Sequence, residues 1–420
     1  MTAIMPAPAI VETGSNSLRL GPFTFGKHLK RWYEPFGNGQ YGLIVTETNA
    51  PLLVASSSAT NNDGDVIKWK KAAPSLTAGP WLMRNHYTNE GEVLWQDNSH
   101  QLHLISASGN ELWKARVDGQ ILGDVTQIDI YRNDKLQMIF STEKSIYCLD
   151  RNGNLVDGYP IRLSGVASSP VAALDYDNNR KYRILIGLKD GSIGNYGVDG
   201  KPISGWKFEA GNSEVITLEH IRIRGKDYVF ALEKDGTIHL LKRNGTPRFE
   251  AKSSAAHHAS QDFYFIDGET IGKTKMIYPD TTGNIVVLQF DQAVADYGLT
   301  GFSAGTHLLV TDITGDNKED FVVADTKEVR AYDSDFKRLF KKSFETAVSG
   351  KPKAFSFSGN QKKIGIIVGE QQYLLDLNGD LQSGFPMPAD RGFIIFDLDR
   401  DGNLEVVGHY QDELICRNLN

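Results

Sequence analysis

The chain has 420 residues, of which 40% are hydrophobic and 10% aromatic, with 41 glycines and a formal net charge of −7. This composition is typical of a globular, turn-rich protein, and the length allows two or three ordinary domains or one large β architecture. The acidic balance argues against binding to nucleic acid or to an anionic membrane surface, which needs a basic face. No apolar run of about 18 residues occurs, so we expect no membrane-spanning segment.

The N-terminal region lacks a basic start followed by an apolar stretch, so it has no signal-peptide pattern. The protein is therefore cytoplasmic, or this chain is a processed part of an exported one. We expect residues 1–39 to form a lead-in and residues 40–420 a single domain.

Most of the chain consists of one repeated unit of about 40–49 residues, a period typical of propeller blades. In the clearest copy, 166–211, short apolar strands are separated by an acidic loop and by turns at Asp190-Gly191 and Asp199-Gly200, and 206–209 alternates as an outer strand. No sustained helical period occurs. The sequence therefore predicts an all-β fold, a β-propeller of four-stranded blades. We expect eight blades, with seven or nine as alternatives, and the units begin near residues 79, 122, 166, 212, 257, 306, 351 and 391.

The last unit stops after its third strand. A blade without an outer strand has an exposed edge, so we expect an N-terminal strand to close the ring. The candidates for this closing strand are 17–20 and 43–46. Alternatively, residues 40–78 form a further, degenerate blade.

An acidic loop lies between two apolar runs of the last unit, at 397–405. Carboxylates at its first, third, fifth and ninth positions suit Ca²⁺, which takes roughly six to eight oxygen ligands at about 2.3–2.6 Å. The loop is not an EF-hand, because Gly408 stands at the twelfth position. The expected ligands are the side chains of Asp397, Asp399, Asp401 and Glu405 and the backbone carbonyl of Asn403.

Two further loops follow this pattern in part. In the loop that begins at Asp175, Asp175 and Asp177 are followed by Arg183 at the ninth position. The guanidinium group of Arg183 would replace the cation there. Ordinary acidic turns are the alternative for all three loops, because Asp, Asn and Gly favour turns. In the loop 312–320, the expected calcium ligands are Asp312, Thr314, Asp316 and Asp320 and the backbone carbonyl of Lys318.

The loops 312–320 and 397–405 resemble the calcium loops of FG-GAP/integrin-α-type and related bacterial propellers, in which the cation pins a loop between adjacent strands. Thr314 and Arg183 depart from that pattern. The region 79–260 also resembles the C-terminal propeller region of uncharacterised exported Bacteroidetes proteins of the DUF3352 type, and this resemblance implies an envelope or surface setting. It rests on Asn85-His86, Trp95-Gln96-Asp97, Gly109-Asn110-Glu111-Leu112-Trp113, Asp150-Arg151-Asn152-Gly153 and Asp175-Tyr176-Asp177.

Catalytic motifs are missing from the sequence: it has no G-x-S-x-G, H-E-x-x-H, P-loop or G-x-G-x-x-G pattern. Propeller glycosidases and lyases use carboxylates that project from inner strands into the central channel. Asp129 and Asp267 could take this role, but the sequence does not favour them over other acidic residues. Cys148 and Cys416 are expected to be buried free thiols.

We therefore expect a non-catalytic, calcium-stabilised propeller that binds another protein of a bacterial envelope assembly outside the cytoplasm. The alternative is a propeller that binds or cleaves carbohydrate at the mouth of its channel.

Overall fold

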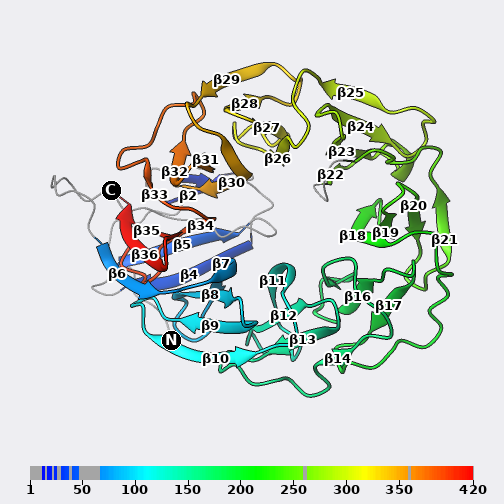
Figure 1. The fold of residues 1–420 in the computed structure, drawn as a ribbon, viewed down its shortest axis with the longest axis horizontal. Helices are drawn as coiled ribbons and strands as arrows, with labels where there is room; N and C mark the ends of the chain where they lie inside the picture. The colour runs from blue at the N-terminus through cyan, green and yellow to red at the C-terminus, as the bar shows by residue number, and fades with distance from the viewer. Residues whose placement is uncertain are drawn as a thin grey trace.

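The computed structural model describes residues 67–258, 263–357 and 361–419, together with the backbone of five short strands between residues 12 and 46. Eight antiparallel sheets stand around a ring, as Figure 1 shows, which confirms the predicted eight-bladed β-propeller. The five N-terminal strands form a sheet and a hairpin of their own: β1 (Glu12–Gly14), β2 (Ser17–Leu20) and β3 (Phe23–Phe25), and β4 (Lys30–Phe36) and β5 (Gln40–Thr46).

Each blade runs from an inner strand beside the central axis to an outer strand on the rim (Figure 1), and we number the blades along the chain. Blades 1 to 4 are β7 (Leu76–Arg84), β8 (Gly91–Asp97), β9 (Gln101–Ile105) and β10 (Glu111–Arg116); β11 (Leu122–Ile128), β12 (Gln137–Ser141), β13 (Ser145–Leu149) and β14 (Ile161–Arg162); β15 (Ala172–Leu174), β16 (Arg183–Gly187) and β17 (Ile193–Tyr196); and β18 (Val215–Ile223), β19 (Lys226–Glu233), β20 (Ile238–Leu241) and β21 (Pro247–Glu250).

The second half of the ring repeats this order, with one 3₁₀ turn, η1 (Ile271–Lys273), in blade 5. Blades 5 to 8 are β22 (Tyr264–Ile266), β23 (Lys275–Pro279), β24 (Ile285–Gln289) and β25 (Asp296–Leu299); β26 (His307–Thr311), β27 (Asp320–Asp325), β28 (Glu328–Tyr332) and β29 (Arg338–Ser343); β30 (Val348–Ser356), β31 (Lys362–Val368), β32 (Gln371–Leu375) and β33 (Met387–Pro388); and β34 (Phe393–Phe396), β35 (Leu404–Tyr410), β36 (Glu413–Leu419) and β6 (Ile67–Ala72).

The core lies between neighbouring blades. The two middle strands of a blade are covered on both faces, and β12 and β13 are accordingly buried along their whole length. Outer strands such as β10 alternate between exposed and half-buried side chains. This difference explains why continuous apolar runs mark the middle strands in the sequence and alternation marks the rim. Cys148 and Cys416 are buried free thiols, as predicted.

Aromatic side chains on the rim pack blade 8 against blade 1 and blade 1 against blade 2. Trp69 of β6 lies against Gly109 of blade 1 and donates its indole N–H to the Ala107 carbonyl at 2.7 Å. Trp113 of β10 lies in the same way against Gly153 of blade 2. A Cβ at either glycine would overlap the indole ring, so the turn requires glycine there for the blades to approach.

The predicted outer strand 206–209 of blade 3 is wrong, because this blade has three strands. Trp206 donates to the Ile193 carbonyl at 3.1 Å, and the Lys207 N–H donates to the Asn244 carbonyl of blade 4 at 2.9 Å. Trp206 and Phe208 pack against the core between blades 3 and 4. The segment is therefore held by its aromatic side chains and by the next blade, and not by a β-ladder of its own.

The ring is closed by an N-terminal strand, as predicted, but the closing strand is β6. It pairs antiparallel with β36, with Cys416 opposite Trp69 and Glu413 opposite Ala72. The candidates 17–20 and 43–46 are wrong, because they pair within the sheet β1–β3 and the hairpin β4–β5. No helix in the described part of the chain is long and apolar enough to span a membrane.

Candidate metal centre

The acidic loop of blade 8 connects β34 to β35, and its residues are held partly by their own backbone. The Glu405 carboxylate accepts the Leu398 N–H at 2.7 Å, and Asp397 accepts the Gly402 N–H at 3.1 Å. Gly402 has a φ of 91°, a left-handed conformation that glycine adopts without strain. These bonds turn the loop back over the end of the sheet.

Three of the predicted calcium ligands converge in this loop. One carboxylate oxygen from each of Asp397, Asp399 and Glu405 lies within 4.8 Å of the others. Among the described residues, this is the group of acidic, histidine or cysteine side chains with spacing suited to a metal ion. Glu405 is almost fully buried, and Oδ1 of Asp397 is buried without a hydrogen-bond partner.

A basic side chain from the closing strand reaches into the same group. Nζ of Lys68 on β6 lies 2.6 Å from Oε1 of Glu405 and 2.8 Å from Oδ2 of Asp399. A third, longer contact of 3.4 Å joins it to Asp401. The ammonium group therefore stands among three of the oxygens predicted to hold a cation. The sequence could not show this contact, because Lys68 and Glu405 are 337 positions apart.

The charges in this cage are only partly balanced. Burial raises the pKa of Glu405 to about 7, against the lowering effect of Lys68 and the Leu398 N–H. Burial also raises the pKa of Asp397. Burial alone would lower the pKa of Lys68, but its hydrogen bonds to Asp399 and Glu405 raise it well above its usual range. The loop has four carboxylates against the Lys68 ammonium group and the Arg400 guanidinium, which also attracts Asp397, so the cage can attract further positive charge.

The loop of blade 6 is arranged differently. Asp312 accepts the N–H groups of Gly315 at 2.7 Å and Asn317 at 2.9 Å. Asp320 accepts the N–H groups of Ile313 and Thr314 and the Thr314 hydroxyl, each at 2.9 Å. The loop thus uses its acids mainly to hold its own backbone. The second oxygen of Asp320 is buried and has no hydrogen-bond partner.

The remaining predicted ligands of these two loops lie at the surface. Asp316 and Asp401 each accept the N–H two residues ahead, from Lys318 at 2.9 Å and from Asn403 at 2.8 Å. The residues Lys318 and Asn403 are exposed.

In blade 3 a guanidinium does contact the acidic loop, but it is not that of Arg183. Arg243 of blade 4 binds both oxygens of Asp177, at 2.7 and 2.9 Å, and also pairs with Asp227. Asp175 accepts the N–H groups of Asn179 and Arg180. The guanidinium comes from the next blade because Arg243 follows β20, whose end adjoins this loop.

Sequence reasoning missed a fourth loop of this kind, at 129–137. Its ninth residue, Gln137, accepts the Ile130 N–H at 2.9 Å, as Glu405 and Asp320 accept the N–H of their own second residues. Arg180 of blade 3 pairs with Asp129 and Asp134. Asp129 is thus a buried, paired acid of this loop. The signal in the sequence is the spacing from Asp129 to Gln137, which stands at the ninth position of the loop. The pattern was missed because Gln137 is not acidic.

Comparison with known proteins supports the fold and goes no further. No family model and no curated protein matches the chain. Among solved structures it is similar to BBS1N in complex with ARL6DN, soaked with lead, with a TM-score of 0.53, 9% identity, and 85% of this chain and 97% of that chain covered. It is also similar to the dihydro-heme d1 dehydrogenase NirN in complex with DHE, with a TM-score of 0.54, 12% identity, and 83% and 75% covered. At these identities the likeness shows a shared β-propeller fold.

Proposed function

We propose that the protein is a non-catalytic, calcium-stabilised β-propeller scaffold in which the acidic loop of blade 8 holds the closing strand through Lys68 and binds Ca²⁺ in competition with it. The carrying observation is the placement of Lys68 of β6 among Asp399, Asp401 and Glu405. One ammonium group thus links the closing strand to the loop. Ca²⁺ is the natural competitor, because it brings two charges to the same oxygens.

The residues present fit a calcium ion in two respects. The unpartnered oxygen of Asp397 offers a ligand that Lys68 does not use. The unpartnered oxygen of Asp320 offers the same in blade 6. A cation at either position would satisfy a buried acceptor that otherwise lacks a partner.

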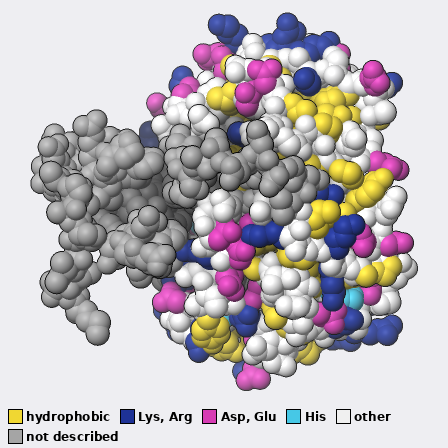
Figure 2. Space-filling view, turned by 90° about the vertical axis from the view of Figure 1, so that its left-hand side faces the viewer, with side chains coloured by type: hydrophobic (Ala, Val, Ile, Leu, Met, Phe, Trp, Pro, Cys, Tyr) yellow, Lys and Arg dark blue, Asp and Glu magenta, His cyan; other side chains and the backbone are white. Residues whose placement is uncertain are grey.

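The scaffold part of the proposal is supported by the surface. The face shown in Figure 2 mixes basic, acidic and hydrophobic side chains without one dominant charge. Tyr87 and Tyr131 stand 65% and 54% exposed in corresponding loops of blades 1 and 2. Tyrosine is enriched at protein interfaces, because its rigid ring offers contact area at low entropic cost. One solved propeller of similar fold, BBS1N, is recorded with a protein partner, ARL6DN.

The resemblance to exported bacterial propellers supports a place in the cell envelope, where calcium is available to weak sites. We therefore propose another envelope protein as the partner. Fractionation of cells that express the natural protein tests this part, and recovery in the cytoplasmic fraction alone would contradict it.

Thermal unfolding in EDTA and in millimolar Ca²⁺ tests the calcium part. A ligand at 100 times its Kd stabilises by about 2.7 kcal/mol, which shifts the melting temperature by several degrees. Asp397→Asn keeps an acceptor for the Gly402 N–H but removes the charge, so we expect it to lose most of the calcium gain. Asp177→Asn, in the loop filled by Arg243, is the matched control and should keep the full gain. Equal melting temperatures in EDTA and calcium for the unmodified protein would overturn the calcium assignment.

A further inference from the structure

Two adjoining cavities of about 450 and 330 Å³ lie where blades 7, 8 and 1 meet. Leu76, Asp390 and Arg391 line both of them, and we call the combined space the seam pocket. Its size is that of a small-molecule site. It is separate from the acidic loop of blade 8, whose residues do not line it.

Irregular backbone forms two walls of the seam pocket. The pairing of β7 with β8 shifts register on both sides of Ala78, and the pairing of β30 with β31 shifts between Ser349 and Lys353. Such bulges redirect strands and are common beside functional sites. They bring Gly79 and Gly350, with φ of 92° and 82°, to the pocket wall together with Gly392 of blade 8. Gly79 packs against the backbone of β8, whereas a Cβ at Gly350 would meet nothing within 4 Å, so the backbone there is open to a ligand.

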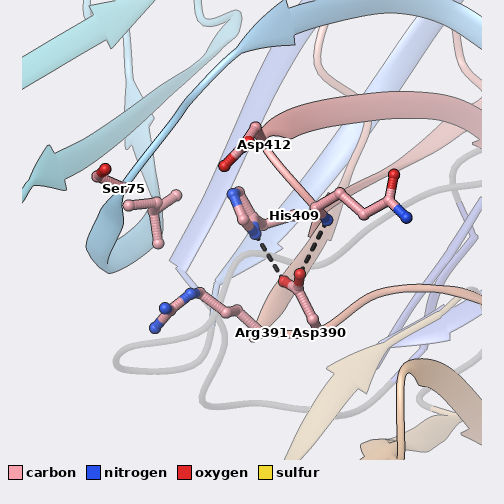
Figure 3. Close-up of a pocket in the computed structure, with 7 residues that line it drawn as sticks. Ser75, Asp390, Arg391, His409 and Asp412 are labelled. Atoms are coloured by element: carbon pink, nitrogen blue, oxygen red, sulfur yellow. Dashed lines mark hydrogen bonds and ion pairs between the residues drawn. The ribbon is translucent and has the colours of Figure 1, made fainter.

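The acid that lines both cavities of the seam pocket, Asp390, already has hydrogen-bond partners. Figure 3 shows Asp390 beside His409, with Nδ1 of His409 2.6 Å from Oδ1 of Asp390. Nε2 of His409 lies 3.2 Å from the Ala73 carbonyl oxygen. Both neighbours of the ring, a carboxylate and a carbonyl oxygen, are hydrogen-bond acceptors. The other oxygen of Asp390 accepts the Gln411 N–H at 2.8 Å.

Two exposed basic side chains lie beside the seam pocket. Arg391 lines both cavities and forms no ion pair or hydrogen bond with its side chain among the described residues. Lys353 does not line the cavities, but its Nζ lies 3.6 Å from the point where a Cβ on Gly392, a lining residue, would stand. Asp124, which attracts Lys353, accepts the Trp81 indole N–H at 2.9 Å. An oxyanion in the seam pocket would be attracted by both basic side chains.

The opposite end of the seam pocket offers hydrogen bonds to neutral groups. Ser75 and Asp412 line it there, and Figure 3 shows the Asp412 side chain beside His409. A carboxylate such as that of Asp412 accepts hydrogen bonds from hydroxyl groups and repels a second anion. A ligand that satisfies both ends carries an acidic group at one end and hydroxyl groups at the other.

We propose that the seam pocket binds a small hydroxylated anion, a sugar acid or a sugar phosphate. Its acidic group lies between Arg391 and Lys353 and its hydroxyl groups face Asp412 and Ser75. The planar guanidinium of Arg391 suits either a carboxylate or a phosphate, since it can bind two oxygens at once.

Isothermal titration of the full chain with glucuronate, glucose 6-phosphate and glucose tests this site. We expect saturable binding of at least one of the two anionic sugars, and binding of glucose at least about tenfold weaker, the effect of losing one charge-assisted hydrogen bond. Binding of glucuronate alone would assign a carboxylate ligand, and binding of glucose 6-phosphate alone a phosphate ligand. If neither anion binds, or glucose binds equally well, the proposal is wrong.

Substitutions of Arg391 and Lys353 test whether the anion binds specifically at the seam pocket or is attracted by any positive charge on the surface. Arg391→Ala and Lys353→Met should each weaken binding of the anionic sugar at least about tenfold. Arg338→Ala removes an exposed arginine from the rim of blade 6 and should leave binding unchanged. An equal loss with Arg338→Ala, or no loss with Arg391→Ala, would overturn the proposal. Melting temperatures of all variants identify any that fails to fold, and Arg391→Lys then replaces Arg391→Ala as the test.

Discussion

The acidic loops of blades 8 and 6 share a sequence pattern but use it for different purposes. In blade 8 the ninth-position acid, Glu405, binds one N–H of its own loop and the ammonium of Lys68. In blade 6 the corresponding acid, Asp320, binds two N–H groups and a hydroxyl of its own loop. The first loop therefore connects distant parts of the chain, and the second stabilises itself. Ring closure explains the difference, because β6 adds its lysine only to blade 8.

The largest expected effect comes from Glu405→Ala. The change leaves Lys68 without its closest partner and the Leu398 N–H unpaired, at a cost of about 3–5 kcal/mol. Because Lys68 lies on β6, hydrogen exchange of β6 and β36 should increase together. Asp320→Ala is the paired variant, and its faster exchange should remain within blade 6. If Glu405→Ala leaves β6 protected, the loop does not hold the ring closed.

Lys68→Met should have the next largest effect, and its sign should depend on calcium. In EDTA it leaves the carboxylates of the cage without their ammonium, and we expect a loss of about 1–3 kcal/mol. In millimolar Ca²⁺ the loss should shrink or reverse, because the ion no longer competes with the ammonium group. Calcium titration followed by melting temperature measures this. Lys70→Met, whose partner Glu413 is exposed, is the control and should change little. A loss of equal size with and without calcium would show that Lys68 acts without competition from the ion.

Arg243→Met extends the comparison to blade 3, where a guanidinium already fills the loop. The variant should lose about 1–2 kcal/mol, because the nearly buried Asp227 loses one of its partners and keeps only His220 and Arg222. We expect no recovery in calcium, since Asp177 and Asp227 come from different blades and the loop has no acid at its ninth position. Recovery in calcium would show that the guanidinium occupies a metal site after all.

The smallest effects are expected for Asn403→Ala and Lys318→Ala. Both side chains are exposed, so stability in EDTA should change by no more than about 0.5 kcal/mol. If their backbone carbonyls bind calcium, the calcium-dependent rise in melting temperature should also survive both changes. A lost rise with Asn403→Ala would mean that the side chain takes part.

The sequence predicted those features that repeat locally and failed where a contact joins distant positions. Turn residues and apolar runs within each unit located the blades, because every blade solves the same packing problem. The closing strand was misplaced, since the segment Ile67–Ala72 has three lysines and little apolar alternation to distinguish it. For the same reason Lys68 could not be assigned to the loop at 397–405. The sequence pattern favours Arg183 as the cation of the blade 3 loop, because Arg183 stands at the ninth position. In the structure Arg243 of the adjacent blade contacts this loop instead.

The distance along the chain between β6 and β36 also has a consequence for synthesis. Lys70 and Glu413, which pair across these strands, are 343 positions apart. At a rate of about 5–20 residues per second, β6 leaves the ribosome on the order of tens of seconds before its partner exists. During that interval an unpaired strand risks joining the wrong edge, and clustered lysines are a known protection against this. We therefore expect Lys68, Lys70 and Lys71 to protect the nascent chain against aggregation before Lys68 joins the cage of blade 8.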